Sequence, residues 1–349
     1  MPVMLDRSVA AKASVEFRDS DGYCLDIGLI NNMPDAALES TERQFIELLD
    51  AAASNVAVRL KLYSSPEVPR FEAGQHYLST CYSDIAELWN SRLDGLIVTG
   101  TEPRTPSLMD EPYWITLTKV ADWAERNAVS TVWSCLAAHA AVLHIDGIRR
   151  HPLDEKRFGV FDCARVSDHP LLAGVSSPLR IAHSRWNELH ERELVASDYA
   201  ILTRSAEAGV DTFVKQRTSL FVFFQGHPEY DGRALLREFR RDIGRFLRQE
   251  RATYPEIPHG YFDEDAADVL AAFRERALSE RREELLERFP SALVDRRLKP
   301  MCGSSSTRVY GNWLTHLTAQ KAQRSAFKPY AVSPRRRRST VSHPVQGLG

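Results

Sequence analysis

The sequence predicts an α/β fold in which a parallel sheet is flanked by helices. From about residue 24 to residue 246, short β-branched and apolar runs alternate with segments of helical periodicity, as in consecutive βα units. Several of the short runs are apolar throughout, which is typical of strands that helices cover on both faces. After Pro255 the composition changes to charged helical segments. These observations together predict one parallel sheet followed by a helical extension.

The first half of the alternating region contains three expected strands and a helix. Residues 25–30 form the first apolar run, which ends at a polar turn. A helix is expected to begin near Thr41, because Gln44 is placed to complete a capping box. Alternation over 56–62 indicates a half-buried strand, whereas 93–99 is nearly all apolar and ends at a glycine.

The second half continues the pattern. The elements expected there, in chain order, are helix 113–127, strand 129–133, helix 136–144, strands 199–203 and 220–224, and helix 233–247. A further helical segment over 263–289 carries apolar residues on roughly one face.

Four parts are expected along the chain. Residues 1–20 form an N-terminal segment, and 21–250 form the α/β domain that carries the chemistry. Residues 251–325 form a helical C-terminal extension. Residues 326–349 combine Arg335 to Arg338 with Ser, Pro and Gly, and this composition predicts a disordered basic tail.

Composition and charge exclude several classes of protein. The 349 residues carry 45 basic and 47 acidic side chains, for a net charge of −2, so no global field favours nucleic acid or a membrane surface. No apolar run is long enough to span a bilayer, and no signal-peptide pattern is present. Five scattered cysteines suit neither a disulfide framework nor a structural zinc site. We therefore expect a cytoplasmic protein that needs no cofactor and no metal, because its histidines show no ligand spacing.

Cys135 is the first candidate for chemistry. It stands where an expected strand passes directly into an expected helix, so its thiol faces the positive end of the helix dipole, which favours a thiolate nucleophile. A buried, inert cysteine is the competing interpretation, because free cysteines are among the most buried residues.

His227 and Glu229 strengthen the catalytic interpretation of Cys135. They follow the expected strand 220–224 with one residue between them, which suits a base and the carboxylate that orients it. Sites in parallel sheets collect at the carboxyl ends of strands. Taken alone, His227 could be a histidine of a turn and Glu229 a solvated surface acid. Together with Cys135, the two residues predict a Cys–His–Glu triad.

A wider set of segments resembles the homoserine O-succinyltransferase (homoserine transsuccinylase) family, which has the class I glutamine amidotransferase-like fold. The match runs from about Leu25 to Leu314 in consistent order. The segments that carry it are 94–100 (DGLIVTG), 113–114 (YW), Cys135, 155–156 (EK), 183–185 (HSR), 226–231 (GHPEYD) and 312–314 (NWL).

The resemblance implies a flavodoxin-like sheet and acyl transfer from an acyl-CoA to the hydroxyl of L-homoserine, in methionine biosynthesis. Cys135 matches the nucleophile that carries the acyl group as a thioester, His227 the general base and Glu229 its partner. The backbone N–H groups of Leu136 and Thr101 are expected to hold the oxyanion. Acyl-CoA enters as a co-substrate, and a homodimer is expected.

The same residue-by-residue match places Lys156, Ser184 and Arg241 where the family binds the amino-acid substrate. A substrate carboxylate needs a fixed cation, which Lys156 or Arg241 could supply. Solvated helix charges are the ordinary alternative for such residues. His183 could equally be a structural histidine.

The chain departs from the family pattern in the loop that is associated with the choice of acyl donor. If residues 94–114 align with the family without gaps, Arg104 takes the position where the family has a small residue or Glu. A guanidinium there could pair with the distal carboxylate of succinyl-CoA and gains nothing from an acetyl group. The departure favours succinyl-CoA; acetyl-CoA as donor or a serine-type acceptor is the alternative. Leu136 and His139 also replace the residues common in the family.

Two other classes of function compete. A glutamine amidotransferase-like hydrolase could use the same triad, but the turn 133–137 (WSCLA) lacks the flanking glycines of that class. A nucleic-acid-binding protein could use Arg335 to Arg338. The lack of aromatic residues between these arginines and the complete triad both argue against a nucleic-acid partner.

Overall fold

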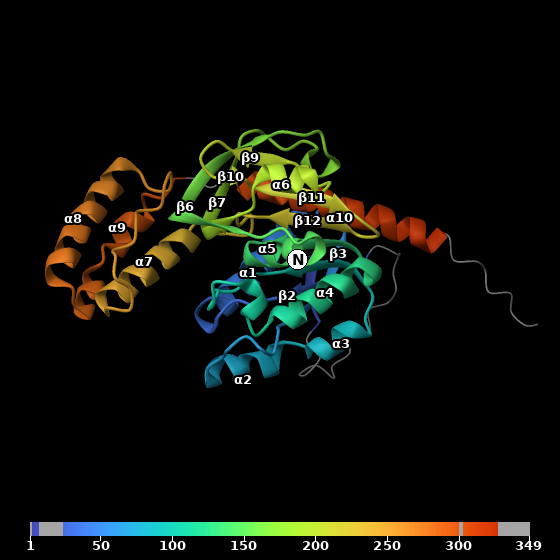
Figure 1. Cartoon of the computed structure of the whole chain (residues 1–349), viewed down its shortest axis with the longest axis horizontal. Coiled ribbons are helices and arrows are strands. Elements are labelled where there is room, and N and C mark those ends of the chain that lie inside the picture. Colours follow the sequence, from blue (N-terminus) through green and yellow to red (C-terminus); the bar gives the residue numbers. More distant parts are fainter. Residues whose placement is uncertain (1, 7–23, 300–302, 327–349) are drawn as a thin grey trace, which may run out of the picture.

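The computed structural model describes residues 2–6, 24–299 and 303–326. An eight-stranded sheet lies at its centre with helices on both faces (Figure 1). The predicted α/β fold is therefore confirmed. Residues 327–349 of the predicted tail and most of the predicted N-terminal segment lie outside the described residues.

The main sheet is parallel over most of its width. Its neighbouring strands are, in order, β1 (Val3–Leu5), β3 (Ala57–Tyr63), β2 (Cys24–Ile30), β4 (Leu93–Val98), β5 (Ala128–Ser134), β12 (Leu220–Phe224), β11 (Thr212–Gln216) and β8 (Ala200–Ile201). All pairs from β1 to β12 are parallel, and β11 and β8 add antiparallel strands at one edge. The order β3-β2-β4-β5-β12 is the flavodoxin-like one.

Helices cover the two faces of this sheet in separate cores. On one face, α1 (Asp35–Ala52) and α10 (Gly303–Ala326) bury their apolar sides against β2, β4 and β5. On the other face lie α3 (Ile85–Trp89), α4 (Trp114–Asn127) and α5 (Leu136–Asp146). Alternate residues of the central strand β12 enter the two cores, which explains why that strand is apolar throughout.

A second sheet lies beside the first and is antiparallel. It pairs β10 (Gly209–Val210), β9 (Thr203–Ser205), β6 (His151–Arg165) and β7 (Leu179–Glu188). The sequence did not predict β6 or β7, because β6 is mostly polar and its pairing shifts register between Pro152 and Arg157. The expected strand 199–203 is divided between the two sheets.

Some element ends also differ from the sequence-based expectation. Helix α1 begins at Asp35 and not near Thr41. Pro34 precedes it with an extended backbone, and Asp35 in the first turn complements the helix dipole. The expected segment 263–289 is α8 (Glu264–Glu280) followed by a 3-10 helix over Glu283–Arg288. Arg281 has a positive φ of 21°, which ends α8.

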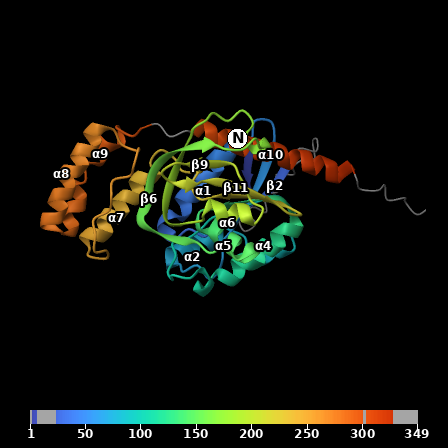
Figure 2. The same ribbon diagram turned by 45° about the horizontal axis from the view of Figure 1, so that its top comes forward.

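The helices after the α/β region lie in two places. α7 (Ala234–Leu247), α8 and α9 (Ser291–Asp295) share a third core with β6, and they form a lobe at one side of the molecule (Figures 1 and 2). The remaining α-helices of the described chain are α2 (Glu72–Cys81) and α6 (Glu191–Ala196), and short 3-10 helices lie at Leu108–Asp110 and Pro170–Leu172. None of the helices in the described ranges is long and apolar enough to cross a membrane.

Helix α10 packs directly against the main sheet. The buried Trp313 donates its indole N–H to Ser130 Oγ on β5 at 2.9 Å. Its ring lies over Gly95 of β4, where a Cβ would come within 2.7 Å of the ring. The predicted extension 251–325 thus ends in a helix that belongs to the core of the sheet.

We expect Trp313→Ala to lower the free energy of unfolding by about 3–5 kcal/mol, because it removes a fully buried aromatic side chain and leaves a cavity over Gly95. Urea denaturation measures the change. The control is Thr315→Ala on the exposed side of the same helix, which should change stability by less than about 0.5 kcal/mol. Equal effects of the two substitutions would contradict the role given to α10.

Candidate active site

Cys135 lies in a strained turn between β5 and α5. Its backbone has φ 53° and ψ −116°, a conformation that is rare for a residue with a side chain and that occurs at functional sites. Its N–H donates to Phe224 O at 2.8 Å, which ties the turn to the end of β12. Gly100 lies against the following residue, because a Cβ there would be 2.8 Å from Leu136 Cβ. The turn therefore presents the thiol at the carboxyl ends of the parallel strands.

His227 and Glu229 follow β12 and form a buried pair. His227 Nδ1 lies 2.8 Å from Glu229 Oε1, and the two residues are 8% and 6% exposed. The backbone N–H of His227 donates to Ala182 O of β7 at 2.8 Å. Ser134, the residue before the cysteine, donates its hydroxyl to the same Glu229 oxygen at 3.4 Å.

The structure brings the three predicted triad residues together. The imidazole of His227 hydrogen-bonds the Cys135 side chain, and Nδ1 is already engaged by Glu229, so Nε2 faces the sulfur. Burial alone would lower the pKa of His227, but its interactions with Glu229 and with Cys135 outweigh burial and raise that pKa well above its ordinary value. The geometry suits a base that holds and returns one proton beside a sulfur nucleophile.

The two predicted oxyanion donors lie near this turn. Leu136 is the first residue of α5, where backbone N–H groups have no acceptor within the helix. Its nitrogen would lie 3.0 Å from a Cβ at Gly100, so the loop that continues through Thr101 passes beside it. The roles of Leu136 and Thr101 stay predictions.

Lys156, Ser184 and Arg241 meet at two carboxylates of α7. Ser184 Oγ donates to Glu238 Oε2 at 2.6 Å. Lys156 Nζ lies 3.2 Å from Asp242 Oδ2 and 3.6 Å from Glu238 Oε2. Arg241 Nη2 lies 2.9 Å from Asp242 Oδ1 and 3.7 Å from Glu238 Oε2. The three residues come from β6, β7 and α7, so only the fold places them in one cluster.

Sequence reasoning missed Glu238, Asp242 and Tyr230. The Tyr230 ring stacks on His227 with centroids 4.2 Å apart, and its hydroxyl donates to Glu238 Oε1 at 2.5 Å. Tyr230 thereby joins the triad to the cluster around Glu238. Burial opposes ionisation of Glu238, but Lys156, Arg241 and the two hydroxyl donors hold its pKa below the ordinary value. The i, i+3, i+4 spacing of Glu238, Arg241 and Asp242 on one helix was the available signal.

The loop that carries Arg104 is anchored at both ends. Glu111 is buried, and its Oε1 accepts the backbone N–H groups of Arg104 at 2.6 Å and Thr105 at 2.8 Å. Near the other end, Glu102 forms a two-point pair with Arg245 of α7 at 2.7 and 2.9 Å. The Arg104 side chain itself is exposed. Sequence reasoning missed Glu111, which shapes this loop.

His183 is a core residue. It is fully buried, its Nδ1 accepts from Arg185 Nε at 3.3 Å, and its Nε2 lies 3.4 Å from Asp211 Oδ1. Burial first, and then the charge of Arg185, hold the pKa of His183 well below its ordinary value. A neutral, buried imidazole with Nε2 beside Asp211 fits the structural interpretation.

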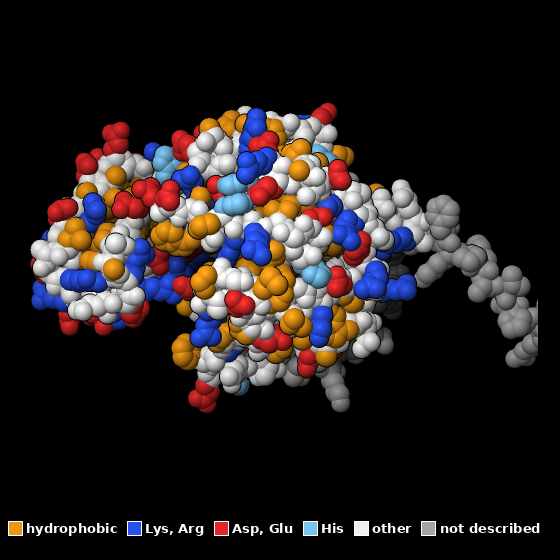
Figure 3. Space-filling view, in the orientation of Figure 1, with side chains coloured by type: hydrophobic (Ala, Val, Ile, Leu, Met, Phe, Trp, Pro, Cys, Tyr) orange, Lys and Arg blue, Asp and Glu red, His pale blue; other side chains and the backbone are white. Residues whose placement is uncertain are grey.

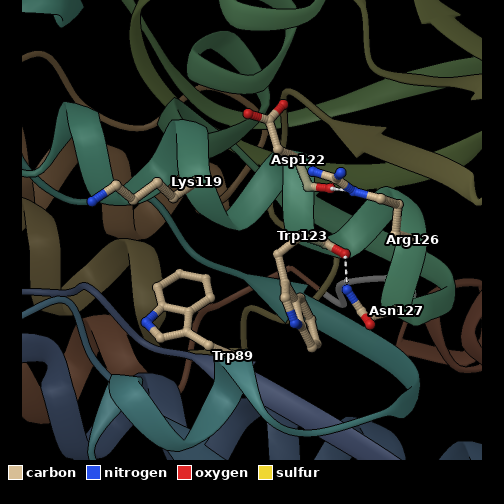
Figure 4. Close-up of a pocket in the computed structure, with 6 residues that line it drawn as sticks. All are labelled: Trp89, Lys119, Asp122, Trp123, Arg126 and Asn127. Atoms are coloured by element: carbon tan, nitrogen blue, oxygen red, sulfur yellow. Dashed lines mark hydrogen bonds between the residues drawn. The ribbon is translucent and has the colours of Figure 1, made fainter.

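A cavity of about 700 Å³ lies on the surface away from the triad, between α3 and α4 (Figure 4). Its lining combines two indole rings with charged and amide side chains: Trp89, Lys119, Asp122, Trp123, Arg126 and Asn127. None of the predicted site residues lines it.

Comparison with known proteins agrees with the resemblance. A sequence model of the family described as homoserine O-succinyltransferase matches residues 3–324. The chain belongs to the homoserine O-succinyltransferase family.

Members of this family resemble the chain over most of its length. A homoserine O-succinyltransferase of Rhodopseudomonas palustris is 47% identical over 322 residues, which cover 90% of this chain and 97% of that one. One of Bradyrhizobium japonicum is 44% identical over 308 residues, or 88% and 94% of the two chains.

Among solved structures, a glutamine amido transferase of Methylobacillus flagellatus is 12% identical to this chain, with a TM-score of 0.48. The match covers 85% of this chain and 96% of that one.

We expect the triad of this homoserine O-succinyltransferase family member to leave a signature in the pH dependence of stability. Because the pKa of His227 is raised, the folded chain holds a proton that the unfolded chain releases near pH 6.5. Stability from this proton is complete below about pH 6.5 and is lost as the pH rises through the folded pKa, with a slope of up to about 1.4 kcal/mol per pH unit.

The measurement is the free energy of unfolding between about pH 6 and pH 9, for the wild type and His227→Asn. The decline should be less steep in the variant. The control is His144→Gln, which removes a histidine of α5 that lies 2.8 Å from Asp122 of α4 and should keep the wild-type slope. Parallel curves for wild type and His227→Asn would contradict the raised pKa.

Proposed function

We propose that the chain transfers a succinyl group from succinyl-CoA to the hydroxyl of L-homoserine through a thioester on Cys135, as a step of methionine biosynthesis. The observation that carries the proposal is the Cys135–His227–Glu229 constellation in a member of the homoserine O-succinyltransferase family. A sulfur nucleophile beside a buried His–Glu pair suits acyl transfer between two acceptors.

The first half-reaction loads the enzyme. Cys135 Sγ, as the thiolate, attacks the carbonyl carbon of the thioester, and the carbonyl oxygen becomes an oxyanion. The C–S bond to coenzyme A then breaks, and the departing thiolate takes the proton of His227. Loss of that proton leaves His227 neutral beside a succinyl thioester on Cys135, which makes it ready to act as a base.

The second half-reaction returns the proton. Neutral His227 takes the proton of the homoserine hydroxyl while the hydroxyl oxygen attacks the carbonyl carbon of the thioester. The Cys135–carbon bond breaks, and the ester leaves while the thiolate and the imidazolium are restored. Glu229 keeps the imidazole oriented at 2.8 Å and stabilises its charge in the resting state. The backbone N–H groups of Leu136 and Thr101 are proposed to hold the oxyanion in both steps.

The cluster beside Tyr230 suits an amino-acid acceptor. A zwitterion carries an ammonium and a carboxylate, and the cluster offers Glu238 and Asp242 for the first and Lys156 and Arg241 for the second. Ser184 supplies a hydroxyl at the same place. These opposite charges neutralise one another in the structure. Binding of the acceptor would therefore replace ion pairs between protein side chains with ion pairs between the protein and the acceptor.

The family membership favours this reaction over amide hydrolysis by a glutamine amidotransferase-like enzyme. Acetyl-CoA as donor and a serine-type acceptor remain the alternatives within acyl transfer. We further propose that the enzyme acts in the cytoplasm, which the four unpaired cysteines of the described ranges support, and that it forms a homodimer.

Replacement of Cys135 by Ala should abolish the acyl-enzyme, because no other group forms the thioester. Intact-protein mass spectrometry after mixing with succinyl-CoA, without acceptor, measures the adduct. The matched control is Cys81→Ala on α2, which should retain both the adduct and turnover. A full adduct on Cys135→Ala would overturn the proposed nucleophile.

Replacement of Arg104 by Ala tests the choice of donor. If the guanidinium pairs with the succinyl carboxylate, its loss should lower kcat/KM for succinyl-CoA by about 10- to 100-fold, the range for a charge-assisted contact. The value for acetyl-CoA should stay within about twofold, since that donor lacks the carboxylate. Equal losses for both donors would show that Arg104 supports the loop and does not select the donor. The control is Arg126→Ala, in the last turn of α4, which should leave kcat/KM unchanged for both donors.

A further inference from the structure

Two histidines and a glutamate meet on the surface at the junction of the second sheet and α6. His151 opens β6, His190 immediately precedes α6, and Glu193 lies three residues further on. The pairing of β6 with β7 places His151 opposite Glu188, two residues before His190. Residues about forty positions apart in the chain are thereby brought into contact.

Both imidazoles face the same carboxylate. His151 Nε2 lies 2.7 Å from Glu193 Oε2, and His190 Nδ1 lies 3.7 Å from the same oxygen. The two rings stack with centroids 3.9 Å apart and planes 6° apart. One ligand atom from each of the three residues lies within 4.8 Å of the other two. Small side-chain rotations therefore bring these atoms around a single ion.

A second carboxylate occupies the position expected for an outer partner of a metal ligand. Glu188 Oε1 lies 3.4 Å from His190 Nε2, the ring nitrogen that faces away from Glu193. A histidine that binds a metal through one nitrogen generally donates the other N–H to a carboxylate, which fixes its tautomer. This contact is independent of the three-ligand cluster and points to the same use of His190.

The cluster is open to solvent on one side. The side chains of His151, His190 and Glu193 are 36%, 38% and 33% exposed. On the face drawn in Figure 3, histidine side chains gather beside acidic ones over the region between β7 and α6. A cavity of about 450 Å³ adjoins the cluster through Pro152 and Glu188. An ion could enter here and keep one position for water.

We propose that His151, His190 and Glu193 bind a divalent transition-metal ion, with Glu188 as the outer partner of His190. Two imidazoles and a carboxylate with one open position are a known ligand set of Zn²⁺, and imidazole favours zinc over magnesium or calcium. This proposal departs from the sequence-based expectation of no metal. It is independent of the proposed acyl transfer, because none of the four residues belongs to the triad or to the Glu238 cluster.

The proposed metal site adjoins the residues that contact Gln225, which lies two positions before His227. Leu189, between Glu188 and His190, donates its N–H to Gln225 Oε1 at 2.8 Å and accepts from Gln225 Nε2 at 3.4 Å. Gln225 also contacts the buried His139. Burial is the main reason why the pKa of His139 is lowered to about 3. A bound ion would hold both ends of this junction and stabilise the folded chain.

The test is a titration of the full chain with Zn²⁺ after treatment with a chelator and desalting, in competition with a chromophoric chelator. The chain should carry Cys135→Ser so that the catalytic thiolate is not counted. We expect one equivalent of Zn²⁺ with at least tenfold weaker binding in His151→Gln, His190→Gln and Glu193→Gln. Glu188→Gln should weaken binding by about tenfold, the effect of losing an outer partner.

The matched control is His144→Gln, which removes another histidine–carboxylate pair and should leave Zn²⁺ binding unchanged. Thermal unfolding with and without Zn²⁺ is the second readout, because an ion that binds only the folded chain raises Tm. Zn²⁺ should raise the Tm of the parent chain and not that of His190→Gln. Absence of Zn²⁺ binding, or binding that the cluster variants do not weaken, would overturn the proposal and leave a hydrogen-bonded surface cluster.

Discussion

The arrangement of the site depends on the backbone turn at Cys135. A parallel strand and the helix that follows it run in nearly opposite directions, so one residue must reverse the chain, and Cys135 does this with a positive φ. Such strain persists only where the surroundings hold it. Here the hydrogen bond to Phe224 O and the close approach of Gly100 to Leu136 hold the turn. The turn is therefore held from both the β12 side and the Gly100 side.

The second sheet provides the other half of this constraint. His227 is held by the backbone of β7 through Ala182 O, and Gly226 fits against the same strand because a Cβ would lie 2.9 Å from that oxygen and 2.6 Å from Ile181. Buried Asp211 accepts the Gly226 N–H at 3.2 Å. The histidine is thus placed by a strand that lies outside the main sheet, and the triad joins the two sheets.

Charge is concentrated where the two sheets meet α7. Glu238 and Asp242 are paired with Lys156 and Arg241, and Tyr230 transmits this arrangement to His227 by stacking. Buried carboxylates remain ionised there only because cations and hydroxyl donors surround them. An apolar pocket in the same place would leave these charges unpaired.

Local patterns along the chain predict the class of fold and the strand-to-helix turn at Cys135. Runs such as Leu220–Phe224 are apolar throughout, and the passage from a strand directly into a helix at Cys135 leaves little choice of local structure. These signals depend on neighbouring residues. The GHPE segment after β12 predicted the base and its carboxylate for the same reason.

Which distant residues meet depends on the packing of the folded chain. β6 escaped prediction because its stability comes from pairing with β7 and not from its own pattern, and the packing of Trp313 on Gly95 joins residues more than two hundred positions apart. The His151–His190–Glu193 cluster depends on the same pairing. Contacts of this kind are set by the burial of whole surfaces, which no local spacing along the chain records.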